Sequence, residues 1–222
     1  GASIDVSNEQ AIQDLVKQTE EEAGPIDLFV SNAGYVTVGG LEVSNDEIQK
    51  MWEVHVMAHV YAARAVLPSM IERGSGYLLN TASAAGLLSQ IGSLAYSMTK
   101  HAAIAFGEWV QITHGYQGIR VSMLCPQAVA TNIGANSPSP DRASKGAPVA
   151  SGDGVLSKED VADVVMQALE EERFWVLPHP EVAEYARRKN NDVDRWLHGM
   201  QRFQGKLYEG RTLPGDWLIG KE

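Results

Sequence analysis

The sequence is poor in cysteine, in positive charge and in long apolar runs, and each shortage narrows the class of protein. Cys125, in the apolar run RVSMLCP, is the single cysteine, so we expect a buried strand thiol, no disulfide, no CxxC zinc pattern and a reducing cytoplasm. The 18 Lys and Arg against 28 Asp and Glu give a net charge of −10, which argues against nucleic-acid binding. No apolar stretch is long enough to span a membrane.

The remaining composition is that of an ordinary globular protein, in which strand and helix patterns alternate. Of the 222 residues, 44% are apolar, enough to bury the core of a single domain over 1–222. Apolar runs and apolar periodicity predict the elements. We expect strands within 26–34, 76–83, 119–126 and 173–178, and helices over 7–23, 44–73, 93–115, 157–172 and 180–203. This alternation predicts an α/β fold with a parallel sheet covered on both faces.

Two of the predicted helices begin with a capping box. In this motif a serine side chain caps the backbone three residues later, and the residue there caps the serine in return. Ser7 with Gln10 predicts the start of the first helix, and Ser44 with Glu47 predicts the start of the second.

The segments that follow three of the predicted strands have unusual compositions. Asn-Ala-Gly at 32–34 follows the first strand, Thr-Ala-Ser-Ala-Ala-Gly at 81–86 the second, and Pro-Gln-Ala-Val-Ala-Thr at 126–131 the third. Tyr96 opens the helix after the second strand. Parallel sheets bind ligands at the carboxyl ends of their strands, so we expect a functional site at this edge.

Ser83, Tyr96 and Lys100 can act there as one chemical unit. Tyr96 and Lys100 are four residues apart, which places them on one face of a helix. A free tyrosine has a pKa of about 10, and a nearby ammonium lowers it. With a serine hydroxyl beside the substrate oxygen, the set could pass a proton to or from an alcohol or carbonyl, and a hydride carrier would complete a redox reaction. Tyrosine and lysine at this spacing alone occur by chance in many helices.

The assembled pattern resembles the short-chain dehydrogenase/reductase family, in its compact single-domain members. It consists of Asn-Ala-Gly, a serine thirteen residues before the tyrosine of Tyr-Ser-Met-Thr-Lys, and Pro-Gln-Ala-Val-Ala-Thr. The match runs from Asp5 and Val6 to the last strand. The resemblance implies a Rossmann-like doubly wound sheet and an NAD(P)-dependent oxidoreductase that acts on a secondary alcohol or ketone. It does not distinguish NAD from NADP.

The same resemblance implies a role for each residue of the predicted edge. Tyr96 is the acid/base, Lys100 lowers its pKa and binds the nicotinamide ribose, and Ser83 orients the substrate oxygen. Asp5 reaches the adenine amino group, with Val6 beside it. The other residues implied in cofactor binding, along with Tyr96 and Lys100, are Asn32, Ala33, Gly34, Pro126, Val129 and Thr131.

Two positions depart from the family pattern. His55 stands where the family usually has a fourth catalytic residue, an asparagine. Either the imidazole holds a water beside Lys100, which would make the reaction more sensitive to pH, or it only packs and hydrogen-bonds inside its helix. His55 and His59 are four residues apart, but no matching glutamate or third ligand accompanies them, and we expect no metal. Gln127 replaces a glycine and restricts its loop.

The family's glycine-rich turn, which binds the diphosphate at a helix N-terminus, does not occur in these 222 residues. The resemblance implies that the first βαβαβ portion, roughly 55 to 60 residues, is absent from this chain, together with the residue that selects NAD or NADP. The first predicted strand would then be an exposed apolar edge. Two functions stay open: a hydride-transferring enzyme, or a catalytically impaired binding or assembly subunit with weak or no nucleotide binding.

Two further expectations concern the surface. The stretch 132–154, rich in Ala, Ser, Gly and Pro, is the implied flexible substrate lid. The resemblance also implies a homodimer or homotetramer that forms through the long helix and the Tyr96 helix. These helices carry Met51, Val54, Ala58, Tyr61, Phe106 and Trp109. Otherwise the expected partner is the small alcohol or ketone, with neither nucleic acid nor membrane.

Overall fold

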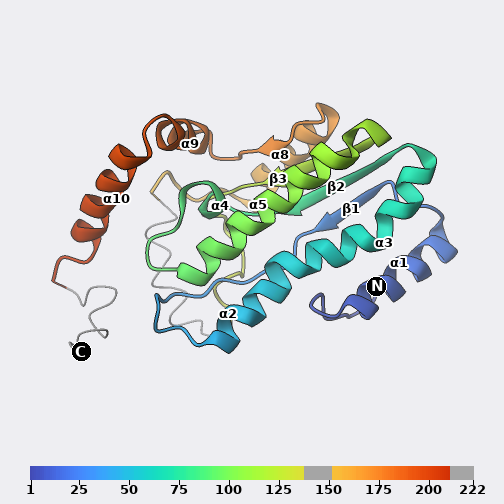
Figure 1. The fold of residues 1–222 in the computed structure, drawn as a ribbon, viewed down its shortest axis with the longest axis horizontal. Helices are drawn as coiled ribbons and strands as arrows, with labels where there is room; N and C mark the ends of the chain where they lie inside the picture. Colours follow the sequence, from blue (N-terminus) through green and yellow to red (C-terminus); the bar gives the residue numbers. More distant parts are fainter. Residues whose placement is uncertain (138–151, 211–222) are drawn as a thin grey trace.

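A four-stranded parallel sheet lies at the centre of the molecule (Figure 1). The computed structural model describes residues 1–137 and 152–210. The strands lie in the order β1 (Leu28–Ser31), β2 (Gly76–Thr81), β3 (Ile119–Leu124) and β4 (Trp175–Val176). Leu28 is opposite Tyr77, and Gly76 is opposite Ile119, so the carboxyl ends of the strands share one edge. The predicted α/β fold with a parallel sheet is confirmed.

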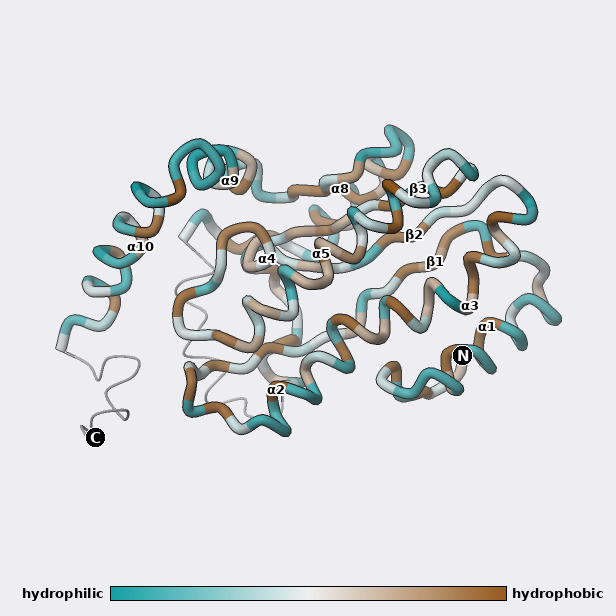
Figure 2. The backbone as a smooth tube through the Cα atoms, in the orientation of Figure 1, coloured by the Kyte–Doolittle hydropathy of each residue, from teal (hydrophilic) through white to brown (hydrophobic). Residues whose placement is uncertain are grey.

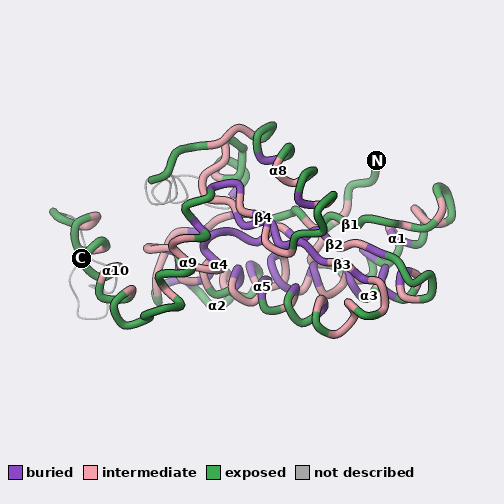
Figure 3. Tube along the Cα trace, turned by 90° about the horizontal axis from the view of Figure 1, so that it is seen from above, coloured by how far each residue is buried: buried purple, intermediate pink, exposed green. Residues whose placement is uncertain are grey.

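Helices cover both faces of this sheet. They are α1 (Glu9–Ala23), α2 (Asn45–Trp52), α3 (Ala58–Arg73), α4 (Ala85–Leu88), α5 (Leu94–His114), α8 (Lys158–Glu170), α9 (Glu181–Asn191) and α10 (Val193–Leu207), with a π turn η1 (Glu53–Met57) and a 3-10 turn η2 (Gly115–Gln117). On one face Leu78 and Val121 join the core of α1, α3 and α5, and on the other Leu79 and Leu124 pack against α8. Figure 3 shows α8 on the opposite side of the strands from α3 and α5. Successive side chains of a strand alternate between its faces, so β2 and β3 serve both cores.

Side-chain caps decide where the first helices begin. Ser44 accepts a hydrogen bond from the Glu47 backbone N–H at 3.2 Å, and the predicted start of the second helix is confirmed. The predicted start of the first helix is wrong by one residue. Asn8 is its N-cap, because the amide oxygen of Asn8 accepts from the Ala11 N–H at 3.1 Å, and Ser7 lies outside the helix.

Three predicted elements differ in extent from those in the structure. Helix 44–73 is interrupted by η1, where the backbone bonds reach one residue further than in an α-helix. The tail 180–203 divides into two helices at Asp192, whose carboxylate accepts from the Arg195 N–H at 2.9 Å and starts α10. Strand β4 has two residues, fewer than the predicted 173–178. Helix α4 was missed, because four residues show no periodic pattern.

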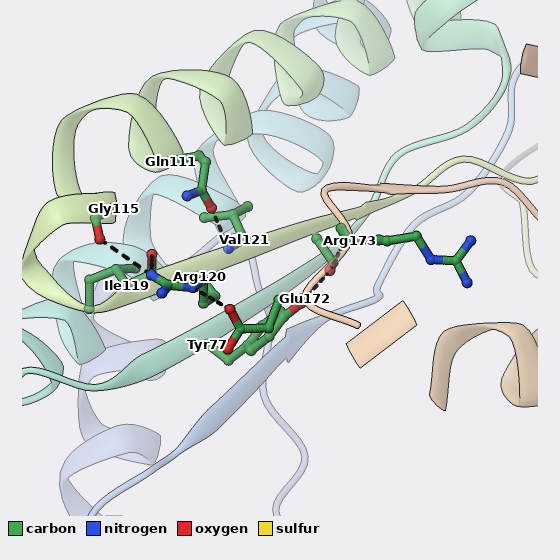
Figure 4. Close-up of polar contacts among 9 residues, drawn as sticks. Tyr77, Gln111, Gly115, Ile119, Arg120, Val121, Glu172 and Arg173 are labelled. Atoms are coloured by element: carbon green, nitrogen blue, oxygen red, sulfur yellow. Dashed lines mark hydrogen bonds and ion pairs between the residues drawn. The ribbon is translucent and has the colours of Figure 1, made fainter. Parts of the chain in front are cut away.

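Polar contacts join β3 to its neighbours in the sheet and in α5 (Figure 4). The Gln111 side chain, on α5, accepts from the Val121 N–H at 2.8 Å. The Arg120 guanidinium bonds to Glu172 at 2.6 Å. Both charged side chains of that pair are partly exposed, so the pair adds little stability, and the partly buried contact with α5 shields its hydrogen bond better from water.

Two of the six residues expected at a subunit interface lie inside the chain's own core. Met51 is fully buried and Ala58 is 7% exposed, so the expectation is wrong for them, since Met51 packs with Tyr35, Ala95 and Tyr96 and Ala58 packs in the sheet core. Trp109 is 60% exposed, so its side chain can contact another subunit. The expected exposed edge is present in β1, where Leu28 and Val30 are 39% and 48% exposed.

Two other expectations meet the limits of the described residues. The implied lid over 132–154 falls largely on 138–151, which lie outside them. Within 1–137 and 152–210, none of the helices combines the length and the apolar character that crossing a membrane requires.

Candidate active site

Hydrogen bonds join the three turns at the carboxyl edge of the sheet. Thr81 Oγ1 donates to Asn32 Oδ1 at 2.8 Å, which links the ends of β1 and β2. The Ala84 N–H donates to the Pro126 carbonyl at 2.9 Å, and Ser83 Oγ lies 3.4 Å from the same oxygen. The segments after β1, β2 and β3 therefore form one continuous surface.

Helix α5 carries Tyr96 and Lys100 to this surface. The two residues are 8% and 4% exposed. Lys100 Nζ lies 5.6 Å from the centroid of the Tyr96 ring and donates to the Thr81 carbonyl at 3.0 Å. The Ser83 hydroxyl accepts from the Ala85 N–H at 3.1 Å and is close enough to the Tyr96 side chain to influence its pKa. The structure thus brings together the three residues that the sequence grouped.

Burial governs the ionisation of both α5 side chains. It lowers the pKa of Lys100 from 10.5 to about 8, because the ammonium has lost its water. It raises the pKa of Tyr96, and the neighbouring Ser83 hydroxyl opposes this only in part. In the chain alone, lost hydration is the largest influence on the phenol, and the lowering of its pKa by Lys100 stays a prediction. Tyr96 is neutral at pH 7 and carries a proton that it can donate.

His55 lies in the π turn and connects the Asn-Ala-Gly turn to α5. Its Nε2 accepts from the Tyr35 backbone N–H at 3.2 Å. A backbone N–H can only donate, so the ring proton is on Nδ1, which lies 3.1 Å from Thr99 Oγ1. The Thr99 hydroxyl donates to the Ala95 carbonyl at 2.9 Å and therefore accepts from the imidazole. Both ring nitrogens have partners.

These contacts favour the second interpretation of His55, in which it packs and hydrogen-bonds within the protein. Burial first, and then the charge of Lys100, hold the His55 pKa well below 6.5. The imidazole is neutral throughout the physiological range, so it does not supply the pH sensitivity expected from a titrating histidine. The π turn that positions it has no signal in the sequence.

His59, one helical turn further on, is a buried histidine of the core. It is 3% exposed, its ring stacks on Phe106 with centroids 6.2 Å apart, and burial lowers its pKa to about 3. Its Nδ1 has no hydrogen-bond partner. The described part of the chain has no cluster of three or more metal-ligating side chains.

The Asn-Ala-Gly turn is exposed directly beside this buried group. Asn32, Ala33 and Gly34 are all exposed. A Cβ on Gly34 would lie 3.3 Å from His55 Nε2 and 3.8 Å from Lys100 Nζ. Without a side chain, the backbone of Gly34 can approach both groups and leaves the surface above Lys100 open.

The other residues implied in cofactor binding have local partners of their own. Asp5 accepts from the Ser7 N–H at 2.9 Å and from its hydroxyl at 2.7 Å, and these bonds lower the Asp5 pKa. Val6 packs against the core under α1 and α3. After β3, Val129 forms an isolated parallel bridge with the segment before α8, and Thr131 is exposed.

A polar network around Gln127 was not found from the sequence. The Gln127 N–H donates to Nδ1 of His179 at 3.2 Å, and His179 is 2% exposed. The Gln127 side chain donates to Asp153 at 2.7 Å, and the Tyr185 hydroxyl donates to the same carboxylate at 2.9 Å. The residue that replaces the family glycine is therefore held from two sides. Its partners lie 26 and 52 residues away, beyond the reach of any local pattern.

A parallel sheet with a phenol, an ammonium and a hydroxyl at its carboxyl edge defines an α/β protein that binds its ligand at the strand ends. The profile of the family described as short chain dehydrogenase matches residues 1–142. The chain belongs to the short-chain dehydrogenase family, whose members are oxidoreductases that use nicotinamide cofactors.

Proteins similar to this chain include two dehydrogenases and a solved structure. The 1-deoxy-11-beta-hydroxypentalenate dehydrogenase of Streptomyces exfoliatus is 32% identical over 88% of this chain and 70% of its own. Estradiol 17-beta-dehydrogenase 11 of Homo sapiens is 35% identical over 59% of this chain and 45% of its own. The short chain dehydrogenase/reductase of Burkholderia phymatum in complex with NAD has a TM-score of 0.79 at 29% identity, covering 87% of this chain and 75% of its own. The predicted family, enzyme class and nicotinamide cofactor are confirmed.

The residues at the carboxyl edge fit the nicotinamide end of such a cofactor. The turn at Gly34 is exposed, and the Lys100 ammonium would lie 3.8 Å from a Cβ at this glycine. Within 1–137 and 152–210, no glycine-rich turn links a strand to a helix N-terminus. The described residues are therefore suited to bind the nicotinamide and its ribose. They do not include a glycine-rich turn that would bind the diphosphate.

Proposed function

We propose that this chain forms an enzyme that transfers a hydride between NAD or NADP and a secondary alcohol or ketone, with Tyr96 as the acid/base. The observation that carries the proposal is the buried pair of Tyr96 and Lys100 beside Ser83, at the edge where parallel sheets bind ligands. Both curated relatives are named as dehydrogenases, which supports the same chemistry.

In this proposal the protein handles the proton and the cofactor handles the hydride. The neutral Tyr96 hydroxyl donates its proton to a ketone oxygen, and in the reverse direction the phenolate takes the proton of the alcohol. Ser83 Oγ donates a hydrogen bond to the same substrate oxygen, and the Lys100 ammonium stabilises the phenolate. A nicotinamide cofactor, when bound, supplies or accepts the hydride at the substrate carbon.

The remaining assignments follow from the same proposal. Lys100 and the exposed turn at Asn32, Ala33 and Gly34 hold the nicotinamide ribose, and His55 positions that turn through the Tyr35 N–H. On the nicotinamide side lie Pro126, Val129 and Thr131, and on the adenine side lie Asp5 and Val6. We further infer one domain over 1–222, a lid over 132–154 that closes on the substrate, and a cytoplasmic location, which the single cysteine supports.

The decisive experiment compares the wild-type chain with Tyr96→Phe in the oxidation of NADH and NADPH across a panel of ketones. We expect Tyr96→Phe to lower kcat by about 10²- to 10⁴-fold, the usual contribution of a positioned acid/base, with an unchanged circular dichroism spectrum. Tyr116→Phe, at a side chain that is 85% exposed, is the matched control and keeps full activity.

Two outcomes would overturn the proposal, and they differ in meaning. Wild-type activity in the Tyr96→Phe protein would reject Tyr96 as the acid/base. A folded wild-type chain that turns over no ketone with either cofactor would reject hydride transfer, and it would favour a binding or assembly subunit.

We also propose that the enzyme is a homodimer or homotetramer whose subunits meet along α5. Five exposed residues follow one another at intervals of seven, four, three and four along this helix and the turn after it, which places them on one stripe. They are Met98, Ala105, Trp109, Ile112 and Tyr116. A continuous apolar stripe on an exposed helix is suited to pack against its symmetry mate.

A further inference from the structure

A pocket of about 290 Å³ lies between the loop before α5 and the helix α10, which stands at the end of the molecule near α4 (Figure 1). Its walls are mainly apolar, and Figure 2 shows apolar residues at intervals along α10. The apolar side chains that line it are Leu88, Ile91, Leu94, Trp196, Leu197 and Met200. This volume is close to the lower end of the range for small-molecule sites.

The floor of the pocket is continuous along the chain with the proposed reaction centre. Ser93 and Leu94 line the pocket and begin the helix that carries Tyr96. Three helical residues rise about 5 Å, so the backbone at Ser93 lies about one helical turn from the backbone at Tyr96. The Leu94 N–H donates to the Gly39 carbonyl at 3.0 Å, and the Gly39 N–H donates to the Gly92 carbonyl at 2.9 Å. These bonds hold the two segments of the floor together.

Lys189 is the one charged residue among those that line this pocket. Its ammonium donates to the Leu87 carbonyl at 2.6 Å and lies 3.4 Å from His101 Nε2. His101 Nδ1 is 2.8 Å from the Ser97 carbonyl, which can only accept, so Nε2 is the acceptor toward Lys189. Within the described ranges, no carboxylate lies within 4 Å of the Lys189 ammonium.

The Lys189 ammonium is half-buried, and its partners among the described residues are neutral. Two neutral acceptors occupy two of its three N–H donors, and partial burial lowers the Lys189 pKa because the charge has lost part of its hydration. A carboxylate would supply the missing charge and the third acceptor in one group. The chain as a whole carries a net charge of −10, so its general field does not attract anions, and Lys189 would act locally.

We propose that this pocket binds the apolar body of the substrate and that Lys189 binds a carboxylate of the same substrate. The preferred substrates are then apolar secondary alcohols or ketones that carry an anionic group away from the reacting carbon. The proposal rests on the proposed function, since it names the substrate class of the same site. It assigns to α9 and α10 the selection of substrate, while the residues at the sheet edge carry out the chemistry.

A purely structural role for Lys189 makes a different prediction. The bond to Leu87 fastens α9 to α4, and a lysine that served only to hold these helices would influence neutral and anionic substrates alike. The test therefore compares two probes of equal length, 9-hydroxydecanoate and 2-decanol, which share the secondary alcohol and differ in the carboxylate.

Binding of both probes is measured by isothermal titration calorimetry, and their oxidation is measured with NAD and NADP. We expect Lys189→Met to weaken the binding of 9-hydroxydecanoate at least tenfold, as loss of a charge-assisted hydrogen bond does, and to leave 2-decanol binding unchanged. Lys206→Met, at an exposed residue near the end of α10, is the matched control and changes neither. A Lys189→Met protein that binds both probes as the wild type does, or weakens both equally, overturns the proposal.

A second variant covers the case in which Lys189→Met disturbs the packing of α9. Lys189→Arg keeps the charge, and we expect it to retain the preference for 9-hydroxydecanoate. Loss of that preference in Lys189→Arg, with an unchanged melting temperature, also overturns the proposal. Preferential binding of 9-hydroxydecanoate without oxidation of either probe would reject the proposed function and leave the carboxylate site in place. Oxidation of both probes with equal KM would reject the carboxylate site alone.

Discussion

At the scale of single residues, the site depends on a charge that water barely reaches. Lys100 is 4% exposed, and its ammonium donates to the Thr81 carbonyl and lies beside the Tyr96 ring. Burial favours the neutral amine and lowers the pKa to about 8, against 10.5 in an exposed lysine. At neutral pH, burial of the charged Lys100 is therefore unfavourable. The arrangement proposed for catalysis lowers the free energy of unfolding.

The first prediction is a pH dependence of stability that comes from Lys100. Between pH 8 and 10.5 the unfolded chain binds more protons at Lys100 than the native chain does, so the free energy of unfolding rises with pH. Below pH 8 both states are protonated and this contribution is constant. The pKa difference corresponds to about 3 kcal/mol at most. Urea unfolding of the wild type and of Lys100→Met across this range measures it, and a difference between them that does not change with pH would contradict it.

His55 shows how a histidine can serve a site without titrating in it. Its two ring nitrogens bond to the Tyr35 N–H and the Thr99 hydroxyl, so it holds the turn at Gly34 against α5. The pKa lies well below 6.5, chiefly because of burial. Its contribution is to position the backbone that faces the cofactor.

The second prediction concerns the replacement of this imidazole. His55→Leu leaves the buried Tyr35 N–H without an acceptor, which costs about 1–3 kcal/mol of stability. We expect a higher KM for the nicotinamide cofactor, with a smaller change in kcat, because the turn at Gly34 is no longer held. Thr99→Val removes only the partner of Nδ1 and should have a weaker effect of the same kind.

The pH profile of kcat/KM separates positioning from proton transfer at His55. We expect the wild type and His55→Leu to have profiles of the same shape between pH 5.5 and 8. An inflection near the ordinary histidine pKa that is present in the wild type and lost in the variant would show that His55 titrates, and would reject the positioning role.

At the scale of elements, the close approach of α5 to β3 decides where Tyr96 and Lys100 lie. Gly107 in α5 is buried against Met123 in β3, and a Cβ at this glycine would collide with the methionine sulfur. A glycine inside a helix is otherwise unfavourable, so its value here is the short distance between helix and sheet.

The third prediction is that Gly107→Ala destabilises the protein although alanine is the better helix former. Overpacking against Met123 should lower the free energy of unfolding by about 1–3 kcal/mol, and Tyr96 should shift with its helix, so that kcat falls too. Gly205→Ala is the matched control, because a Cβ there meets nothing within 4 Å, and it should raise stability slightly. Thermal unfolding of the two variants measures the contrast, and equal melting temperatures would contradict it.

At the scale of the whole molecule, the main feature is the apolar stripe along α5, which lies on the surface of the single chain. Ile112 and Tyr116 are 81% and 85% exposed, and Trp109 is 60% exposed. Large apolar side chains in a contiguous stripe usually mark an interface. Here it is on the same helix as Tyr96, so association would also stabilise the helix that carries the site.

The fourth prediction is that Ile112→Glu shifts the protein toward the monomer. A carboxylate at the centre of the stripe would be desolvated without a partner in the oligomer, which is strongly unfavourable. Analytical ultracentrifugation measures the mass. Met166→Glu, at a residue on α8 that is 58% exposed, should leave the oligomer unchanged. A wild-type protein that sediments as a monomer would reject the interface.

Much of the site could be predicted because its signals are local in the chain. Tyr96 and Lys100 are one helical turn apart, and Ser83 and the Asn-Ala-Gly turn each follow an apolar run directly. The cap at Ser44 likewise acts within three residues. Predictions failed where a neighbour competed or where packing intervened, as at Asn8, which replaced Ser7 as the cap.

By itself, the sequence determined the order of strands and helices, the family, and the three residues at the centre of the site, because these depend on short local patterns and on the order of those patterns along the chain. Only the tertiary structure decided how those residues behave. The raised pKa of Tyr96 and the lowered pKa of Lys100 come from burial by distant segments. The contacts of His55 and of Lys189 join residues up to 44 and 102 positions apart. Hydration and charge depend on which groups meet in space, and only the folded chain brings these groups together.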